Sequence, residues 1–370
     1  MVTILINGTA AKSSGALTVL SDCVNYIEHN PMEGKDFHLF TVINKFDDLK
    51  KIKVHKLHNQ NWLSRILWDN GGLQKWCIKN KIEPNIVISL QNTSTKYKNK
   101  NGSMIKQIVY YHQSIPLYKK SDLDHTLKIM LYYFFYPFFV NRNNISTNYV
   151  VQLPFIKELF CKRFNNIAKE RVTVIRPNKP LIDINNVKGI EFSSKEKIFR
   201  FLYPATSFKY KNHTVIISAL KKLSKISHVI EKIIVYFTVD KLSENIMNDI
   251  ALNNLESCVK FIGQVPYKDL LSYYKSVDGL LFPSKLESFP LPILEASCFG
   301  LPIIISDLPY AREGLFDYNN KYFINPDDVD AWTAAIQENK NYKKIVPEKV
   351  NIKENSWDNF FNLVDKLILE

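Results

Sequence analysis

Short apolar runs of strand length alternate with longer segments of helical period along almost the whole chain. Val2–Ile6, Asn85–Ser89 and Ile233–Phe237 are typical of the runs, which are rich in Val and Ile and contain few polar residues. Strands of a parallel sheet have this composition because helices cover the sheet on both faces. The alternation therefore predicts an α/β fold, in which parallel strands are joined by crossover helices.

The alternation is interrupted at 176–186 by RPNKPLIDINN, which has two prolines and is our expected interdomain linker. A chain of 370 residues suits two domains of ~150–200 residues better than one. We expect two Rossmann-like, doubly wound domains over residues 1–180 and 188–352, which face each other across a ligand cleft. The last apolar segment, at 355–370, is expected to be a helix that packs back on the first domain.

A net charge of +13 favours an anionic partner, which could be nucleic acid, an anionic membrane surface or a phosphate-rich ligand. The lysines are dispersed, so charge alone does not choose among these. The five cysteines form no CxxC pair and the eight histidines no HExxH motif, which predicts a cytoplasmic protein without a metal site. No apolar run has the ~18–20 residues of a membrane span, and no signal-peptide pattern is found at the start of the sequence.

Ile129–Val140 (IMLYYFFYPFFV) is uncharged and dense in aromatic residues. Two interpretations stay open for it. It could be a buried helix that is kinked at Pro137. It could also be a patch that lies at the headgroup depth of a membrane, beside Lys119, Lys120 and Lys128.

Residues 281–307 (LFPSKLESFPLPILEASCFGLPIIISD) contain the clearest candidate site. We expect a strand to end before Pro283 and a helix to begin at Pro292, where a missing N–H is tolerated, and to end at Gly300. Glu287 then lies in the loop, and Glu295 lies in the first turn of the helix. A helix N-terminus suits a phosphate, and carboxylates accept hydrogen bonds from sugar hydroxyls, so a nucleotide sugar fits. Alternatively, Glu295 complements the helix dipole and Glu287 is a surface acid.

This segment resembles the retaining glycosyltransferases of family 4, which carry a Glu-x7-Glu motif at this place. Glu287 and Glu295 match the pair, Ser284 matches the serine before it, and the tail of the motif is matched by Gly300, Pro302 and Asp307. The resemblance implies the GT-B fold, a nucleotide-sugar-binding second domain and an acceptor-binding first domain. It also implies that Glu295 holds the ribose hydroxyls and Glu287 the transferred sugar.

The same resemblance places Phe289, Pro290 and Leu291 against the donor sugar and phosphate. Pro290 stands where the family usually has glycine and removes one N–H donor, whereas the N–H of Leu291 remains. The family usually has an arginine and a lysine that clamp the diphosphate. Lys211 matches the lysine, but the arginine position holds a small residue near 205–207, and Lys209 is the candidate replacement.

In the first domain, the resemblance points to three further residues. Ser14-Gly15 stands where the family often has a glycine pair in its N-terminal loop, which makes Gly15 a donor-site candidate. His112 follows a strand and matches a family histidine that faces the donor sugar, although a lone histidine is more often a structural hydrogen-bonder. Asn92, in the loop after Asn85–Ser89, is expected to point into the same cleft.

The resemblance thus implies a retaining, metal-independent hexosyltransferase without a cofactor, with Glu287, His112 and Lys211 in catalysis. A UDP- or GDP-sugar would be the donor, and a glycan or glycolipid the acceptor. Such an enzyme would act in lipopolysaccharide, O-antigen or capsule assembly at the inner face of the cell membrane, without a nucleic-acid partner. Two alternatives stay open. One is another GT-B enzyme, such as a nucleotide-sugar epimerase or a phosphorylase. The other is a basic protein that binds membranes or polyanions without catalysis.

Overall fold

The structure is a computed structural model that describes residues 1–370 except 13, 59–60, 124–125, 142–144, 181, 193–197, 316, 339–341 and 347–355. The chain divides into two compact units. The first consists of Met1–Tyr118, Thr126–Asn178 and Ile352–Glu370, and the second consists of Lys119–His125 and Lys179–Asn351. The expected end of the second domain at residue 352 and the expected helix start at residue 355 lie outside the described residues.

The first unit is built on a parallel sheet with the strand order β3-β2-β1-β4-β5-β6-β7. Its strands are β1 (Val2–Asn7), β2 (Lys35–Thr41), β3 (Ile52–Lys56), β4 (Ile86–Ser89), β5 (Lys106–Tyr110), β6 (Thr147–Val151) and β7 (Val172–Val174). The order reverses between β1 and β4, and the carboxyl ends of the strands at such a reversal are where doubly wound sheets bind ligands.

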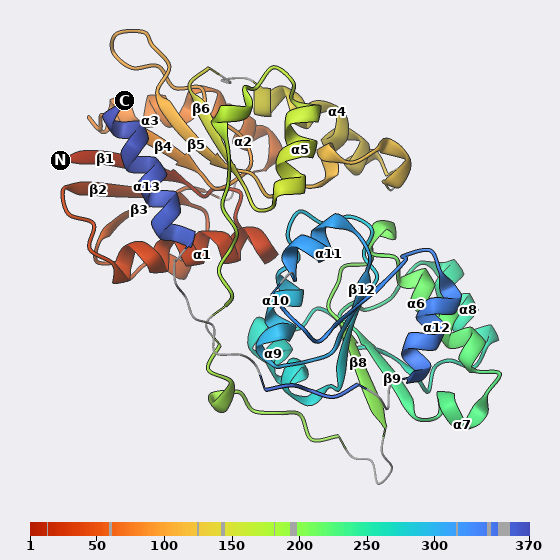
Figure 1. Cartoon of the computed structure of the whole chain (residues 1–370). Coiled ribbons are helices and arrows are strands. Elements are labelled where there is room, and N and C mark those ends of the chain that lie inside the picture. Colours follow the sequence, from red (N-terminus) through yellow and green to blue (C-terminus); the bar gives the residue numbers. More distant parts are fainter. Residues whose placement is uncertain are drawn as a thin grey trace. The chain divides into compact units, whose positions relative to one another are not determined.

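Helices cover this sheet on both faces (Figure 1). On one face, α1 (Ser14–His29) and the C-terminal helix α13 (Ser356–Leu369) share a core with β1, β2, β4 and β5. On the other face, α3 (Leu73–Lys79) packs against Leu5, Phe40 and Val87; α2 (Trp62–Leu67) and the π-helical turn η2 (Trp68–Gly72) precede it. The C-terminal helix is held by its buried aromatic residues and by an ion pair from Lys35 to Asp365, at 2.9 Å.

The aromatic segment forms α4 (Leu127–Asn141), and α5 (Pro154–Arg163) follows β6. Pro137 lies inside α4 and has no N–H to offer the carbonyl of Tyr133, four residues earlier. The guanidinium of Arg163 donates to that carbonyl at 3.2 Å and so ties α5 to α4. The helix is neither wholly buried nor wholly exposed. One side carries buried Ile129, Tyr136 and Val140, whereas Phe134, Phe135 and Phe138 on the other are 57%, 56% and 68% exposed.

The second unit repeats the plan with a parallel sheet in the order β10-β9-β8-β11-β12-β13. Its strands are β8 (Phe199–Tyr203), β9 (Ile233–Phe237), β10 (Val259–Phe261), β11 (Gly279–Phe282), β12 (Ile303–Ser306) and β13 (Lys321–Ile324). Figure 1 shows α6 (His213–Leu223), α8 (Glu244–Leu252) and α12 (Val329–Gln337) on one side of this sheet. On the other side are α9 (Tyr267–Ser276), α10 (Leu291–Cys298) and α11 (Pro309–Gly314), and the short α7 (Ser227–Ile230) follows α6.

In the second unit, the apolar run Ile233–Phe237 forms β9, and the strand that was expected to end before Pro283 is β11, which ends at Phe282. Strands β3 and β6 were not expected. In β3, lysines alternate with Ile and Val because it is an edge strand, so it lacks the apolar run of a central strand.

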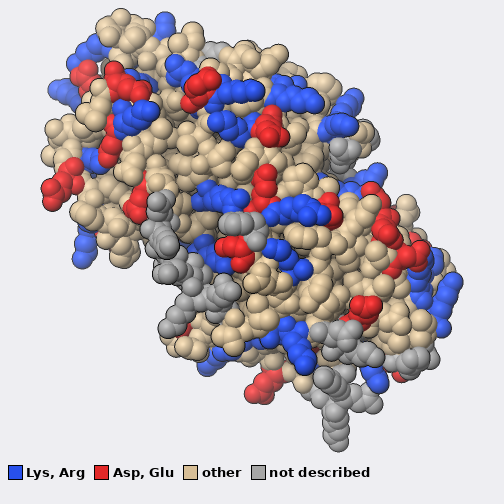
Figure 2. Space-filling view, viewed as in Figure 1, with Lys and Arg blue, Asp and Glu red and all other residues tan. Residues whose placement is uncertain are grey.

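Basic and acidic side chains are interspersed over both units on the face shown in Figure 2. Several of the described lysines belong to ion pairs within the first unit, such as Lys53 with Asp36 and Lys100 with Glu83. The dispersed lysines of the sequence thus do not gather into one continuous basic area on this face.

Candidate functional site

The candidate site of the second unit lies where its strand order reverses, between β8 and β11. The loop that leaves the carboxyl end of β8 carries Lys211, and the loop that leaves β11 carries Glu287. Because the two strands are hydrogen-bonded neighbours, both loops emerge at the same edge of the sheet. This is the position at which open α/β sheets bind their ligands.

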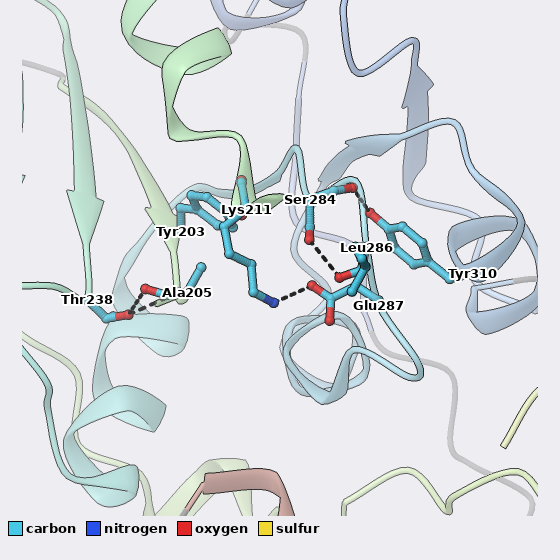
Figure 3. Close-up of polar contacts among 8 residues, drawn as sticks. All are labelled: Tyr203, Ala205, Lys211, Thr238, Ser284, Leu286, Glu287 and Tyr310. Carbon is cyan, nitrogen blue, oxygen red and sulfur yellow. Dashed lines mark hydrogen bonds and ion pairs between the residues drawn. The ribbon is translucent and has the colours of Figure 1, made fainter. Parts of the chain in front are cut away.

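Lys211 and Glu287 form an ion pair with 2.5 Å between Nζ and Oε1 (Figure 3). Their side chains are only 14% and 12% exposed. The hydroxyl of Tyr203 donates to the carbonyl of Lys211 at 2.5 Å, and the N–H of Lys285 donates to the carbonyl of Tyr210 at 2.8 Å. Both loops are therefore fixed at the backbone as well as through the ion pair.

The loop before Glu287 is held from two sides. The hydroxyl of Ser284 donates to the carbonyl of Leu286 at 3.3 Å, and the hydroxyl of Tyr310 in α11 donates to the carbonyl of Ser284 at 2.6 Å (Figure 3). Ser284 is fully buried. Its side chain thus orients the loop that presents Glu287.

Glu295 is in α10, but not in its first turn as the sequence predicted. The helix begins at Leu291 with Pro290 as N-cap, which makes Glu295 its fifth residue. The prediction placed the start at Pro292, but a proline fits either of the first two helical positions because neither N–H has a partner within the helix. The interpretation that Glu295 merely complements the helix dipole loses its basis, since that effect is confined to the first turn.

The carboxylate of Glu295 is buried, with 7% of the residue exposed, and Oε2 accepts a hydrogen bond from the hydroxyl of Tyr274 at 2.9 Å. Burial raises the pKa of Glu295 to about 6, and hydrogen bonds from Tyr274 and Tyr267 partly oppose this shift. The group is thus ionised at neutral pH and becomes protonated in mildly acidic solution. Nothing in the sequence had singled out Tyr274, because it reads as an ordinary apolar-face residue of α9.

Between these two acids, the start of α10 offers little to a phosphate. Pro290 and Pro292 have no N–H, and the N–H of Ile293 donates to the carbonyl of Pro290 at 3.2 Å. Within residues 290–293, this leaves the N–H of Leu291, as the sequence predicted. Phe289 and Leu291 are both half-buried where the chain enters the helix.

At the expected arginine position, Ala205 has no side chain to clamp a phosphate. The N–H of Ala205 donates to Oγ1 of Thr238, at the end of β9, at 3.1 Å (Figure 3). Lys209 is exposed and shares the 3-10 turn Lys209–Lys211 with the paired lysine. Asn212 then turns the chain into α6 with a φ of 58°, in the left-handed region that Asn adopts more readily than most residues.

In the first unit, the structure brings Asn92 and His112 together. The backbone N–H of His112 donates to Oδ1 of Asn92 at 2.5 Å, and Nδ2 of Asn92 lies 3.1 Å from Nε2 of the ring. Burial lowers the pKa of His112 to about 4, and a hydrogen bond with the backbone of Tyr110 partly opposes the shift. The imidazole is therefore neutral at physiological pH.

Gly15 is the second residue of α1, and a Cβ there would meet open space. The tight place in this turn is Gly8, where an added Cβ would lie 2.9 Å from the Leu20 side chain. In this turn, the glycine that close packing requires is therefore Gly8, where α1 packs against the end of β1. A role for Gly15 in the donor site stays a prediction.

The comparison with protein families bears on the second unit. Residues 187–359 match the family described as Glycosyl transferases group 1. We refer to this matched region as the group 1 domain. The match covers both loops of the candidate site and α10, so Lys211, Glu287 and Glu295 all lie in the group 1 domain.

Whole-chain comparisons extend the likeness beyond the group 1 domain. The chain is 26% identical to the "O-antigen chain mannosyltransferase RfbU" of Salmonella typhimurium over 241 residues, which are 63% of this chain and 64% of that protein. Its fold is similar to that of the "lipopolysaccharide outer core galactosyltransferase WaaB apo form", with a TM-score of 0.62, 19% identity and 99% of both chains covered. The Anabaena protein Alr3699/HepE, solved "in complex with UDP and glucose", gives a TM-score of 0.67 at 14% identity, again over 99% of both chains. The predicted α/β fold of the GT-B type, with two Rossmann-like units, is confirmed.

Within the group 1 domain, the arrangement pairs the Lys211 cation with the Glu287 carboxylate and adds the buried carboxylate of Glu295 in α10. The cation can neutralise a phosphate, and the two acids can accept hydrogen bonds from hydroxyl groups. Across the part of the chain that the structure describes, no cluster of three or more His, Cys, Asp or Glu side chains is placed to hold a metal ion. Likewise, none of the described helices is long and apolar enough to cross a membrane.

Proposed function

We propose that the protein is a retaining glycosyltransferase that moves a hexose from a UDP- or GDP-sugar to a hydroxyl of a glycan or lipid-linked glycan. The observation that carries the proposal is the Lys211–Glu287 ion pair at the strand-order reversal of the group 1 domain, followed by buried Glu295. The name of the Salmonella relative supports a role in O-antigen assembly, and the UDP and glucose bound in the HepE structure support a nucleotide-sugar donor.

In this proposal the ion pair is the donor-free state of the site. The diphosphate of the donor takes the place of Glu287 as the partner of Lys211 Nζ, and the carboxylate of Glu287 then accepts hydrogen bonds from hydroxyls of the transferred sugar. Glu295 accepts the ribose hydroxyls. Because the pair is largely shielded from water, the Lys211 ammonium is already desolvated, and the diphosphate supplies the negative partner that the lysine loses when Glu287 turns to the sugar.

The transfer breaks the bond between the anomeric carbon and the diphosphate oxygen and forms a bond to the acceptor oxygen on the same face of the sugar. The acceptor proton passes to the leaving diphosphate. Lys211 stabilises the charge that develops on that group, which is why we propose that neither a metal nor a cofactor takes part. His112 and Asn92 are proposed to contact the donor sugar, whereas the roles of Gly15, Lys209, Phe289 and Pro290 stay predictions.

A nucleotide panel tests the proposal. Isothermal calorimetry with UDP, GDP, CMP and dTDP should show binding of one uridine or guanosine diphosphate, and Glu295→Ala should weaken it by at least tenfold because the ribose loses its acceptor. Glu244→Ala, which removes an exposed acid from α8, is the matched control and should bind normally. Failure of all four nucleotides to bind would falsify the proposal.

Two measurements separate the alternatives. Consumption of the donor without any acceptor, giving an epimer or a sugar phosphate, would identify an epimerase or a phosphorylase. Binding of polyanions that weakens steeply with salt, together with no nucleotide affinity, would identify a basic binding protein without catalysis.

For the acceptor side, we propose that the first unit docks on an anionic membrane surface through α4. The exposed side of α4 carries Leu127, Leu131 and three phenylalanines at helical spacing, 41–77% exposed. Arg163 ties α5 to α4, and a cavity of about 460 Å³ is lined by Lys157, Glu158 and Lys162 of α5 and by Lys169 in the turn that precedes β7, so its lining has more basic than acidic side chains. An apolar helix face beside basic side chains is the composition of helices that lie at the interface of anionic lipid.

The lysines that the sequence analysis placed beside this patch do not carry the argument. Lys119 and Lys120 are exposed but belong to the second unit, and the side chain of Lys128 lies outside the described residues. The lysines of α5 supply the positive charge instead.

Sedimentation with vesicles that contain anionic lipid tests the docking. Phe134→Ser combined with Phe135→Ser should abolish binding, whereas Leu252→Ser, which alters an even more exposed apolar residue on α8, should leave it intact. Equal sedimentation of the wild type, the double variant and Leu252→Ser would contradict the role of α4 and would leave the proposed reaction unaffected.

A further inference from the structure

A buried carboxylate in the first unit has no part in the proposed reaction. Asp69 lies in the π-helical turn η2 and is 4% exposed. Its carboxylate accepts hydrogen bonds from Nδ2 of Asn7 at 3.0 Å, from Nε2 of Gln91 at 2.8 Å and from the hydroxyl of Thr93 at 3.1 Å. A buried carboxylate is costly unless its hydrogen bonds are made, and the backbone next to Asp69 departs from helical geometry at Asn70 and Gly71, where the chain kinks between α2 and α3. Both facts raise the question of what this network holds in place.

The network joins the two strand ends at the order reversal of the first sheet. Gln91 follows β4, and its Oε1 accepts from the hydroxyl of Thr9 at 2.9 Å and from the N–H of Ala10 at 3.1 Å, both in the turn after β1. From α4, the hydroxyl of Tyr136 donates to the carbonyl of Gln91 at 3.3 Å. Gln91, on the amino side of Asn92, is thus held through its side chain by η2 and the turn after β1, and at its backbone carbonyl by α4.

Asn92 stands between the two residues that Asp69 holds in this loop, Gln91 and Thr93. Its φ is +70°, in the left-handed region, which is uncommon for a residue other than glycine and more accessible to Asn than to most. This conformation directs the side chain to His112. Without the anchors on either side, an extended conformation would be open to Asn92 and would turn its amide away.

The contact between Asn92 and His112 defines the tautomer of the histidine. The backbone N–H of His112 can only donate, so the amide atom that accepts from it is Oδ1 and the other is Nδ2. Nδ2 therefore donates to Nε2 at 3.1 Å, which makes Nε2 an acceptor and leaves the ring proton on Nδ1. The ring presents one fixed face and one fixed protonation pattern.

We propose that Asp69 is a positioning residue that, through Gln91 and Thr93, holds Asn92 in its left-handed conformation and thereby fixes the orientation and the Nδ1–H tautomer of His112. The consequence for catalysis rests on the proposed function, because it requires His112 to contact the donor sugar. The consequence for the tautomer does not, so the two can fail separately.

The experiment is ¹⁵N NMR of the full chain with labelled histidine, in which His112→Gln assigns the signals of His112. The wild type should show a protonated Nδ1 and an unprotonated Nε2. Asp69→Ala removes all three acceptor contacts, and Thr93→Val removes one while it keeps the shape of the side chain. Both should lower the ratio of the Nδ1–H to the Nε2–H tautomer, by about tenfold for Asp69→Ala, in proportion to the hydrogen bonds lost.

Asp69→Asn separates positioning from charge. Its Oδ1 still accepts from Asn7 and Gln91, and its new amide can donate to the Thr93 hydroxyl, which can also accept. The variant should therefore keep the wild-type tautomer ratio, whereas a role for the negative charge alone predicts that it behaves like Asp69→Ala. Thr173→Val, in β7, is the control for loss of a threonine hydroxyl in the same sheet.

The proposal is overturned if Thr93→Val and folded Asp69→Ala both keep the wild-type ratio. If Asp69→Ala does not fold, Thr93→Val decides alone. In an activity assay, loss of positioning should lower kcat for the transfer and leave the affinity for the free nucleotide unchanged. A shifted tautomer ratio with unchanged kcat would contradict the proposed role of His112 while the positioning by Asp69 stands.

Discussion

The two units have the same strand order around their reversal point but fill it with opposite chemistry. In the second unit, between β8 and β11, a lysine and a glutamate face each other as a pair that is still 12–14% exposed. In the first unit, between β1 and β4, the same place holds Asn7, Thr9, Asp69, Gln91 and Thr93, all 0–4% exposed and hydrogen-bonded to one another.

The difference shows how one topology serves two purposes. A pair of opposite charges that can still reach solvent can exchange partners when a charged ligand arrives. A network of amides and hydroxyls around one buried acid has its hydrogen bonds made within the protein, so it shapes the loops around it and is not itself open to a ligand. Changes at the second reversal point should therefore alter the reaction, and changes at the first should alter stability and loop geometry.

The largest effect is expected from Lys211→Met. The neutral side chain has a similar length but cannot stabilise the leaving diphosphate, so kcat/KM for transfer should fall by about 10²–10³-fold. Lys222→Met, which breaks the exposed ion pair with Asp330 on the same unit, is the control and should change activity and stability little. A loss below about fivefold in Lys211→Met would remove the basis for the proposed charge exchange.

The next largest effect should be on stability in the first unit. Asp69→Ala leaves buried donors of Asn7, Gln91 and Thr93 without their acceptor, and we expect a loss of about 3 kcal/mol in the free energy of unfolding. Affinity for the free nucleotide should not change, because its proposed contacts, Lys211 and Glu295, lie in the group 1 domain. Urea denaturation measures the free energy of unfolding, and calorimetry on the same preparation measures the nucleotide affinity. An unchanged free energy of unfolding would show that the network does not stabilise the first unit.

A smaller, pH-dependent effect is expected at Glu295. Its folded pKa of about 6 lies above the ordinary value of 4.5, so ionisation costs stability as the pH rises through this window. A shift of this size corresponds to about 2 kcal/mol at pH 7.5. Glu295→Gln should therefore unfold at a higher urea concentration than the wild type at pH 7.5 but not at pH 4, while nucleotide binding weakens. The same difference at both pH values would contradict the shifted pKa.

The smallest effect is expected from Tyr274→Phe. The buried ring keeps its packing, whereas Glu295 loses one donor, so we expect a cost of about 1 kcal/mol at pH 7.5. The pKa of Glu295 should rise further, since the tyrosine hydroxyl partly opposes the effect of burial. In a plot of nucleotide affinity against pH, the fall in affinity on the acidic side should therefore begin at a higher pH. If this fall stays at the same pH, a group other than Glu295 is responsible for it.

Helices and strands with a clear local pattern could be predicted. In the second unit, β9 and the end of β11 agree with the prediction, whereas edge strand β3 of the first unit was not predicted because its lysines alternate with apolar residues. For α4 the sequence left two interpretations open, because nearly every residue is apolar and no periodicity marks a buried side. Contacts of Tyr136 with Gln91 and of Arg163 with Tyr133 decide which side is covered.

Residues of the candidate site divide in the same way. Glu287, Glu295 and Lys211 could be named from short motifs and their resemblance to a family, and the structure pairs two of them. Tyr274 and Asp69 could not be named. A tyrosine on a helix and an aspartate in a turn carry no distinguishing signal in the sequence. Their roles depend on the fold, which brings Tyr274 to Glu295 and Asp69 to Gln91.

The sequence by itself determined the alternation of strands and helices and the two-unit α/β plan, and it predicted the acids and the lysine of the candidate site. These depend on the periodicity and order of neighbouring residues. Tertiary structure alone decided that Lys211 pairs with Glu287, 76 residues later in the chain, and that burial raises the pKa of Glu295. It also decided that Asp69 accepts hydrogen bonds from Gln91 and Thr93 in the loop after β4. The physical reason is that hydrogen bonds, ion pairs and desolvation depend on distance and burial in space, and no local pattern encodes either.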